Sequence, residues 1–306
     1  MIKSYLRSLY RTLPFKRPVF DFLRRIGASH WIPAHLKPYL AFTGAFTVQV
    51  ENVRFTMLHG YGRDIEATIF WDGVDAFEPT TINWWRELSK RSTYIFDIGA
   101  NTGIYSLVAK SLNPKAEIHA FEPLVRIYKI LEANIQLNNL NSPDAAIKAH
   151  RVALSDYSGQ GKMYDLPVEH MYTASLNRNV HTERGQPMQS VQEVVDVLRL
   201  DDFMRQEKIQ GLDLIKIDVE SHEPAVLRGM GECLRKFHPS LIIEIWNNEV
   251  GIAVEAALTD CNYIYFALST SQPTRTPHIR NDDPDKGYIN YLVCTSKVAQ
   301  GIGLIH

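Results

Sequence analysis

The sequence predicts an α/β protein with a seven-stranded, mostly parallel sheet and helices on both faces. Three observations predict this fold. Short apolar segments alternate with helical patterns along residues 94–294, an order typical of βα units that build a parallel sheet. A glycine-rich turn directly follows the first apolar segment. The chain has 306 residues, 45% hydrophobic and 22% charged, so it is long and apolar enough to bury such a sheet.

Each expected strand is a short apolar segment bounded by polar or turn residues. The seven segments are residues 94–96, 117–121, 147–154, 212–217, 241–245, 263–268 and 289–294. Apolar residues recur with helical spacing over 104–112, 125–137 and 223–237. The connection over 155–211 is far longer than most connections in compact domains. We therefore expect it to recognise a ligand, with His170, Tyr172 and Ser175 as candidates.

An N-terminal extension, residues 1–76, is expected to precede the main domain, residues 77–306. Alternating apolar residues predict a β-hairpin over 46–58, and residues 66–71 are expected to form a second extended segment. The spacing of Ile82, Trp85 and Leu88 predicts a helix over 79–90.

The first 25 residues carry seven basic side chains and one acidic one, a net charge of +6, whereas the rest of the chain carries −7. Apolar residues between Ile2 and Leu13 recur at three- and four-residue steps, which predicts a basic amphipathic helix. Such a helix either packs on its own protein or lies on an anionic membrane surface. Nucleic acid is a poor partner because the basic stretch is short and the remaining chain is acidic.

The cysteines indicate a reducing compartment. Cys233, Cys261 and Cys294 are odd in number and widely spaced, which favours reduced thiols and argues against structural zinc. No apolar run approaches the roughly 18 residues that a membrane-spanning helix needs. We therefore expect a cytoplasmic protein, with peripheral membrane contact through residues 1–25 left open.

The glycine-rich turn indicates the cofactor. Asp97-x-Gly99-x-Asn101-x-Gly103 lies where α/β sheets bind nucleotides, between the first strand and its helix. A carboxylate at Asp97 repels a pyrophosphate but favours a ligand that carries an ammonium group. S-adenosylmethionine has an α-amino group and no phosphate, so this charge favours it over NAD. A nicotinamide-dependent dehydrogenase remains the less favoured alternative.

Glu122 ends the second strand, 25 residues after Asp97. A carboxylate at that strand end accepts hydrogen bonds from ribose hydroxyls. The same position serves NAD and S-adenosylmethionine equally, so Glu122 indicates a nucleoside without naming it.

These segments resemble the FkbM family of S-adenosylmethionine-dependent methyltransferases. The likeness rests on FDIGANTG over 96–103, HAFEP over 119–123, VALSD over 152–156 and LIKIDVESHE over 214–223. It implies a class I methyltransferase (Rossmann-like) fold and methyl transfer to a hydroxyl of a glycan or a small secondary metabolite. One departure is Ser221, because the family usually has glycine there.

The resemblance also implies roles for individual residues. The expected cofactor contacts are Asp97, Gly99, Ala100, Asn101 and Gly103 around the methionine part, Glu122 at the ribose, Ala153 near the adenine, and Asp218.

Asp218, Glu220 and His222 are the expected catalytic residues, since they follow the fourth strand at its carboxyl end. Either Glu220 or His222 is expected to act as the base, with Asp218 contacting the cofactor. Two structural alternatives stay open: Glu220 or Glu223 caps the next helix, and His222 is a surface imidazole. Glu244 is a further candidate for binding the acceptor.

No metal site is expected. Asp218, Glu220 and His222 are competent ligands, but no motif fixes three ligands at a diagnostic spacing. A non-catalytic module that keeps the S-adenosylmethionine pocket is the alternative from a different functional class.

Overall fold

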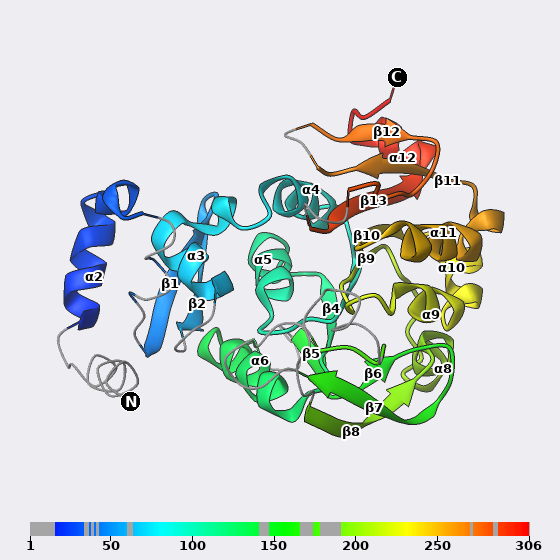
Figure 1. Ribbon diagram of the computed structural model, residues 1–306, viewed down its shortest axis with the longest axis horizontal. Helices are drawn as coiled ribbons and strands as arrows, with labels where there is room; N and C mark the ends of the chain where they lie inside the picture. The colour runs from blue at the N-terminus through cyan, green and yellow to red at the C-terminus, as the bar shows by residue number, and fades with distance from the viewer. Residues whose placement is uncertain are drawn as a thin grey trace. The chain divides into compact units, whose positions relative to one another are not determined.

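A computed structural model describes residues 16–33, 37, 40, 43–59, 64–140, 147–165, 174–177, 191–269, 272–283 and 287–305. The chain divides into two compact units, Met1–Pro79 and Thr80–His306, whose elements are labelled in Figure 1. The predicted basic helix between Ile2 and Leu13 lies outside the described residues.

The N-terminal unit contains a helix, a hairpin and a second helix. Its elements are the helices α2 (Lys16–Arg25) and α3 (Asp64–Asp72), the strands β1 (Gly44–Val50) and β2 (Val53–His59), and two short 3₁₀ helices, η1 (Ala28–Trp31) and η3 (Val74–Ala76). β1 and β2 pair antiparallel, as predicted. The extended segment predicted over 66–71 is wrong, because these residues form α3. Glu66 and Phe70, and Ala67 and Trp71, are buried at a spacing of four, which is the helical period.

The second unit contains an eight-stranded sheet in the order β12-β11-β13-β10-β9-β3-β4-β5. The strands are β3 (Tyr94–Ile98), β4 (Glu117–Phe121), β5 (Ile147–His150), β9 (Leu214–Ile217), β10 (Ser240–Ile245), β11 (Tyr263–Ala267), β12 (Thr274–Thr276) and β13 (Ile289–Thr295). The five strands from β5 to β10 are parallel, and β13 is antiparallel to both of its neighbours. The mostly parallel α/β fold is confirmed. The eighth strand, β12, is a short polar edge strand without an apolar pattern.

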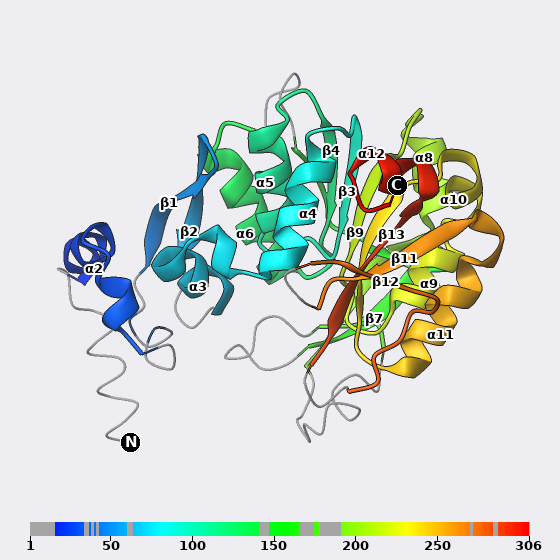
Figure 2. The ribbon, with the colours of Figure 1, turned by 90° about the horizontal axis from the view of Figure 1, so that it is seen from above.

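Helices cover both faces of this sheet, as Figure 2 shows. On one side lie α4 (Pro79–Ser89), α5 (Ile104–Leu112) and α6 (Val125–Leu137). On the other lie α8 (Leu200–Gln206), α9 (Glu223–Arg228), α10 (Gly231–Phe237) and α11 (Asn248–Ala257). An apolar core packs this second group of helices against the sheet through side chains such as Phe96, Ile215 and Val226.

The helix predicted over 223–237 is two helices, α9 and α10. The chain breaks at Gly229, whose carbonyl accepts a hydrogen bond from the backbone N–H of Asp201 instead of continuing a helix. A Cβ atom at Gly229 would lie 1.9 Å from the carbonyl oxygen of Ser155, so only glycine fits this approach.

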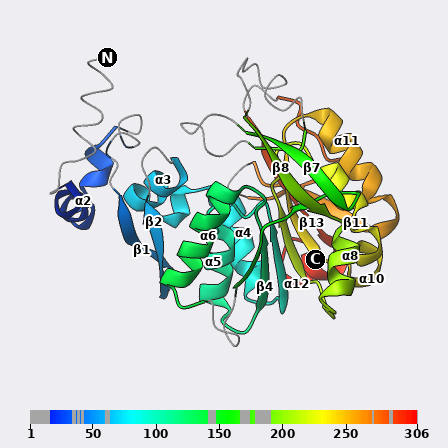
Figure 3. The same cartoon turned by 90° about the horizontal axis from the view of Figure 1, so that it is seen from below.

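The strand predicted over 147–154 is also divided. Residues 147–150 form β5 in the large sheet, while β6 (Ala153–Leu154) joins a separate sheet in the order β6-β8-β7. β7 (Gly159–Asp165) and β8 (Val191–Leu198) come from the long 155–211 connection, and Figure 3 shows them from below. This small sheet packs through Met163, Val195 and Val197 on Leu124 and Ile127 at the start of α6.

Candidate functional site

The candidate site lies at the carboxyl ends of β3, β4 and β9. β4 and β9 flank β3 on opposite sides, so the connections diverge at this edge, which is where open α/β sheets have their ligand-binding crevice. Backbone hydrogen bonds tie the three ends together: Asp218 N donates to Ile98 O at 3.0 Å, and Ala100 N donates to Phe121 O at 2.9 Å. The glycine turn, the second strand end and the expected catalytic corner are therefore neighbours.

Gly99 determines how closely two of these segments approach. Its φ of 82° lies in the left-handed region, and a Cβ atom there would lie 1.8 Å from the carbonyl oxygen of Asp218. Any side chain would push the glycine turn away from the end of β9. Gly99 thus lets the glycine turn lie directly against the end of β9.

Glu122 is held at the tip of the glycine turn. Its Oε2 accepts a hydrogen bond from Asn101 N at 3.2 Å, and its Oε1 accepts one from Leu124 N at 2.9 Å. Burial raises the pKa of this carboxyl to about 7. The structure thus brings together two of the expected cofactor residues that lie 21 positions apart in the chain.

Asp97 is almost fully buried and links the turn to α5. Its Oδ2 accepts hydrogen bonds from Ser106 N at 3.0 Å and Ser106 Oγ at 2.6 Å. Burial raises the pKa of this carboxyl to about 6. The bond to Ser106 was not predicted. A serine in the first turn of the helix after the motif was the signal, because Ser hydroxyls commonly pair with nearby carboxylates.

His222 pairs with the segment expected near the adenine. Its Nε2 lies 2.9 Å from Ser155 Oγ, and burial lowers the pKa of the imidazole to about 4, so the ring is neutral at pH 7. Ala153, also in that segment, is buried in β6. The structure places this segment beside the corner that follows β9.

Asp218, Glu220 and His222 do not continue β9 on one extended face. β9 ends at Ile217, and Glu220 and Ser221 have φ of 60° and 68°. Two successive left-handed residues turn the chain into α9. Glycine fits this conformation best, which explains the glycine that the resemblance implies at position 221.

Three carboxylates gather at the ends of β9 and β10. The side chains of Asp218, Glu220 and Glu244 place one oxygen each within 4.8 Å of the others. Glu244 is buried, and Trp246 Nε1 donates a hydrogen bond to its Oε2. Burial, together with the charges of Asp218 and Glu220, raises the pKa of Glu244 well above its ordinary value. Carboxylate oxygens are the donors that a hard divalent cation prefers, so this cluster, not the set with His222, could hold one.

Lys216 supplies positive charge beside this cluster. It is 1% exposed, and its Nζ lies 3.0 Å from Asp218 Oδ2 and 5.1 Å from the centre of the Tyr105 ring. On β9 it pairs in register with Asp97 of β3. Sequence reasoning missed this residue, although a lysine inside the buried segment Leu214–Ile217 breaks the apolar pattern and is rarely buried without a partner.

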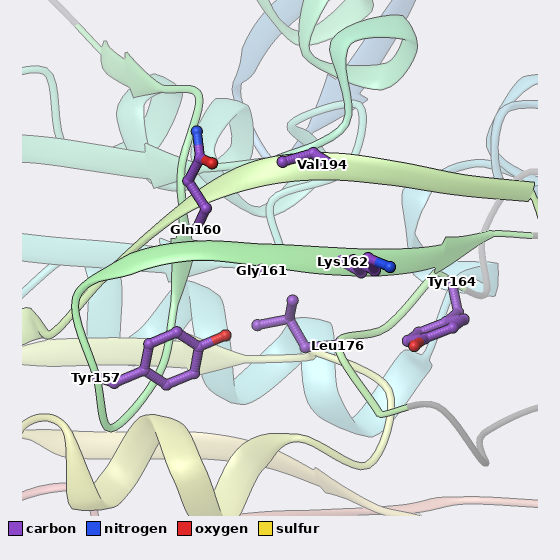
Figure 4. Close-up of a pocket in the computed structure, with 7 residues that line it drawn as sticks. All are labelled: Tyr157, Gln160, Gly161, Lys162, Tyr164, Leu176 and Val194. Atoms are coloured by element: carbon purple, nitrogen blue, oxygen red, sulfur yellow. The ribbon is translucent and has the colours of Figure 1, made fainter.

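The long connection also contacts the corner. Ser175 Oγ donates a hydrogen bond to Val219 O at 3.1 Å, and Ser175 bridges to Tyr164 of β7. An open hollow of about 500 Å³ lies on this small sheet, and Figure 4 shows its lining. The lining residues are Tyr157, Gln160, Gly161, Lys162, Tyr164, Leu176 and Val194. His170 and Tyr172, the other two residues of the connection expected to recognise a ligand, lie outside the described residues.

The strand order and the glycine turn define a Rossmann-like α/β protein, and the fixed carboxylate of Glu122 lies at the edge where such sheets bind nucleotides. The family model described as the methyltransferase FkbM domain matches residues 97–265. The chain therefore belongs to the FkbM methyltransferase family. This confirms the resemblance, and with it the methyltransferase class and S-adenosylmethionine as the cofactor.

Three relatives illustrate the likeness. Methyltransferase sdnD of Sordaria araneosa is 29% identical over 189 residues, which cover 55% of this chain and 72% of the relative. The 31-O-demethyl-FK506 methyltransferase FkbM of Streptomyces tacrolimicus is 29% identical over 44% of this chain and 58% of its own length. The hexuronic acid methyltransferase AglP of Haloferax volcanii is 25% identical over 52% of this chain and 58% of its own length.

Among solved structures, methyltransferase FkbM from Methylobacillus flagellatus superposes with a TM-score of 0.43 at 12% identity. The superposition covers 75% of this chain and 55% of that one.

Proposed function

We propose that this methyltransferase transfers the methyl group of S-adenosylmethionine to a hydroxyl oxygen of a glycan or a small metabolite. The observation that carries the proposal is the position of the carboxylate cluster of Asp218, Glu220 and Glu244 directly beside the crevice that Gly99 shapes. A methyl donor and a group that removes a hydroxyl proton must be adjacent for this reaction.

The residues of the crevice fit the cofactor. Asp97, Gly99, Ala100, Asn101 and Gly103 surround its methionine part, Glu122 accepts hydrogen bonds from the ribose hydroxyls, and Ala153 flanks the adenine. Support comes from the two backbone N–H groups that orient Glu122 and from the absence of a side chain at Gly99. When bound, the cofactor supplies an electrophilic methyl group on a positively charged sulfur.

Glu220 is the proposed base. It belongs to the cluster and is partly exposed, whereas burial lowers the pKa of His222 to about 4, which makes it a weak base, and its Nε2 is bonded to Ser155. The acceptor oxygen forms a bond to the methyl carbon, the electron pair of the broken carbon–sulfur bond stays on sulfur, and the hydroxyl proton passes to Glu220. Asp218, whose carboxylate is oriented by Lys216, is the residue of the cluster proposed to contact the cofactor.

The acceptor class follows from two lines of support. Two relatives are named for a 31-O-demethyl compound and for a hexuronic acid, and both kinds of molecule carry hydroxyl groups. In this chain the long connection contacts the catalytic corner through Ser175, so it can recognise an acceptor there. We assign this activity to a methyltransferase domain over residues 77–306, preceded by an extension over residues 1–76.

The test is methyl transfer from S-adenosylmethionine with a radiolabelled methyl group to a panel of glycosides, uronic acids and hydroxylated polyketides. With one acceptor class, we expect the label in a methyl ether and not in a methyl ester. Glu220→Gln should lower kcat by about a hundredfold. Glu232→Gln, which changes an exposed carboxylate on α10, is the matched control. Cofactor binding without transfer to any hydroxyl acceptor would favour the non-catalytic module instead.

A further inference from the structure

The N-terminal unit exposes an apolar stripe on α2. Nine large apolar side chains are exposed among the residues that the structure describes, and four of them fall within the 13 residues from Val19 to Trp31. Val19, Phe22 and Ile26 are 52%, 59% and 55% exposed. Val19 and Phe22 lie three residues apart in α2. Ile26 lies four residues further on, in the turn directly after α2, where its backbone N–H donates to Phe22 O at 3.1 Å, so the three side chains share one face.

A different face of α2 fixes the helix to its own unit. Phe20 is buried and packs edge-on against Trp71, with ring centres 5.4 Å apart. Arg24 lies over the ring of Phe70 and donates a hydrogen bond to Thr47 O at 3.2 Å, and Arg17 donates one to Ala45 O. The contacts of this face with β1 and α3 leave the stripe of Val19, Phe22 and Ile26 directed away from that packing.

The chemistry around the stripe matches an anionic lipid surface. Arg17 and Arg25 are the exposed basic residues of the helix, against a single acid, Asp21, whereas Lys16 is buried and Arg24 packs on Phe70. Trp31, in the short helix that follows, is 84% exposed, and tryptophan favours the interface between headgroups and acyl chains. A short helix with one apolar face and basic flanks lies in the plane of such an interface.

We propose that the N-terminal unit binds the surface of anionic membranes through a membrane face made of Val19, Phe22, Ile26 and Trp31. The apolar side chains insert between headgroups, and the exposed Arg17 and Arg25 attract anionic lipid. A second copy of the chain is the rival occupant, but a repeated basic helix would repel its own copy. The proposal does not depend on which acceptor the enzyme methylates.

The test is co-sedimentation of the full chain with vesicles of phosphatidylcholine that contain roughly one third phosphatidylglycerol, and with vesicles of phosphatidylcholine alone. We expect binding to the anionic vesicles, reduced at least about tenfold by the combined substitutions Val19→Ser, Phe22→Ser and Ile26→Ser. The matched control combines Leu137→Ser, Val194→Ser and Ile252→Ser, three exposed apolar positions of the second unit, and should bind like the wild type.

Tryptophan fluorescence gives a second readout, which needs only a single substitution. Anionic vesicles should shift the emission of the wild type to shorter wavelength, and Trp31→Phe should abolish the shift. Absence of binding, equal binding to neutral vesicles, or unchanged binding of the triple variant would overturn the proposal. A dimer in solution that the triple variant converts to a monomer would assign the face to a second copy instead.

Discussion

Lys216 and Asp218 form an ion pair that crosses from the core to the mouth of the crevice. Nζ and Oδ2 are 3.0 Å apart, and the exposed fraction rises from 1% for the lysine side chain to 27% for the aspartate. A buried cation therefore supports a carboxylate that a ligand can reach. This arrangement makes Lys216 a positioning residue for the carboxylate cluster of Asp218, Glu220 and Glu244.

Substitution of Lys216 should shift the pH dependence of catalysis. Lys216→Met removes a cation that lowers the pKa of Glu244, so the carboxylate cluster keeps its proton to higher pH. We expect the acidic limb of kcat to move up by about one pH unit or more, with activity recovering at alkaline pH. Lys216→Arg keeps the charge and should shift the limb less. An unshifted limb in Lys216→Met would show that the lysine serves packing alone.

Ser221 should be replaceable by glycine with a gain in stability. Its φ of 68° is unfavourable for serine and favourable for glycine. Part of the gain is offset because glycine increases the entropy of the unfolded chain. We expect Ser221→Gly to raise the free energy of unfolding by about 0.5–1 kcal/mol in chemical denaturation. Ser221→Ala is the control and should give no gain.

Glu223 should make the protein less stable at alkaline pH. Burial raises its pKa from 4.5 to about 8, so the folded state holds a proton that the unfolded state releases above pH 4.5. The stabilising contribution is full below pH 4.5 and is lost as the pH rises through 8. Glu223→Gln imitates the protonated form. In denaturant titrations, the free energy of unfolding should fall between pH 5 and pH 9 by at least about 2 kcal/mol less for Glu223→Gln than for the wild type. Parallel pH profiles would contradict the assignment.

Chelation tests the carboxylate cluster. The ammonium group of Lys216 already faces Asp218, and the raised pKa of Glu244 favours a protonated side chain, which is a poor metal ligand. We expect dialysis against EDTA to leave the methyl-transfer rate within about twofold of the untreated enzyme. A loss of activity that Mg²⁺ restores would instead assign Asp218, Glu220 and Glu244 as metal ligands.

Sequence patterns predicted most of the main sheet because its strands are short, apolar and separated by helical segments. They failed where tertiary contacts decide the conformation. Residues 66–71 are apolar enough for either a strand or a helix, and packing around Phe70 selects α3. Gly229 divides the predicted helix because its neighbour in space is the carbonyl of Ser155, which lies far away in the chain.

The candidate site was predictable where motifs mark it. The glycine turn and Glu122 indicated a nucleoside crevice, and the structure brings Asn101 and Glu122 into contact. The gathering of Glu244 with Asp218 was not predictable, since it depends on the pairing of β10 with β9. The pairing of His222 with Ser155 depends in the same way on the turn at Glu220 and Ser221.

Among the described residues, no helix is both long enough and apolar enough to cross a membrane.

The pH dependence of cofactor binding should depend on Glu122. Its carboxyl has a pKa of about 7, and the ionised form is the better acceptor for ribose hydroxyls. We expect the affinity for S-adenosylhomocysteine to rise as the pH increases from 6 to 8, and Glu122→Gln to flatten this dependence.

The most direct test of the central claim is calorimetric titration of S-adenosylhomocysteine into the wild type and Glu122→Ala, with Glu232→Ala as the matched control. We expect micromolar binding to the wild type and the control, and binding at least about tenfold weaker to Glu122→Ala. Equal affinity for all three proteins would contradict the assignment of the crevice at Gly99 and Glu122 as the cofactor site.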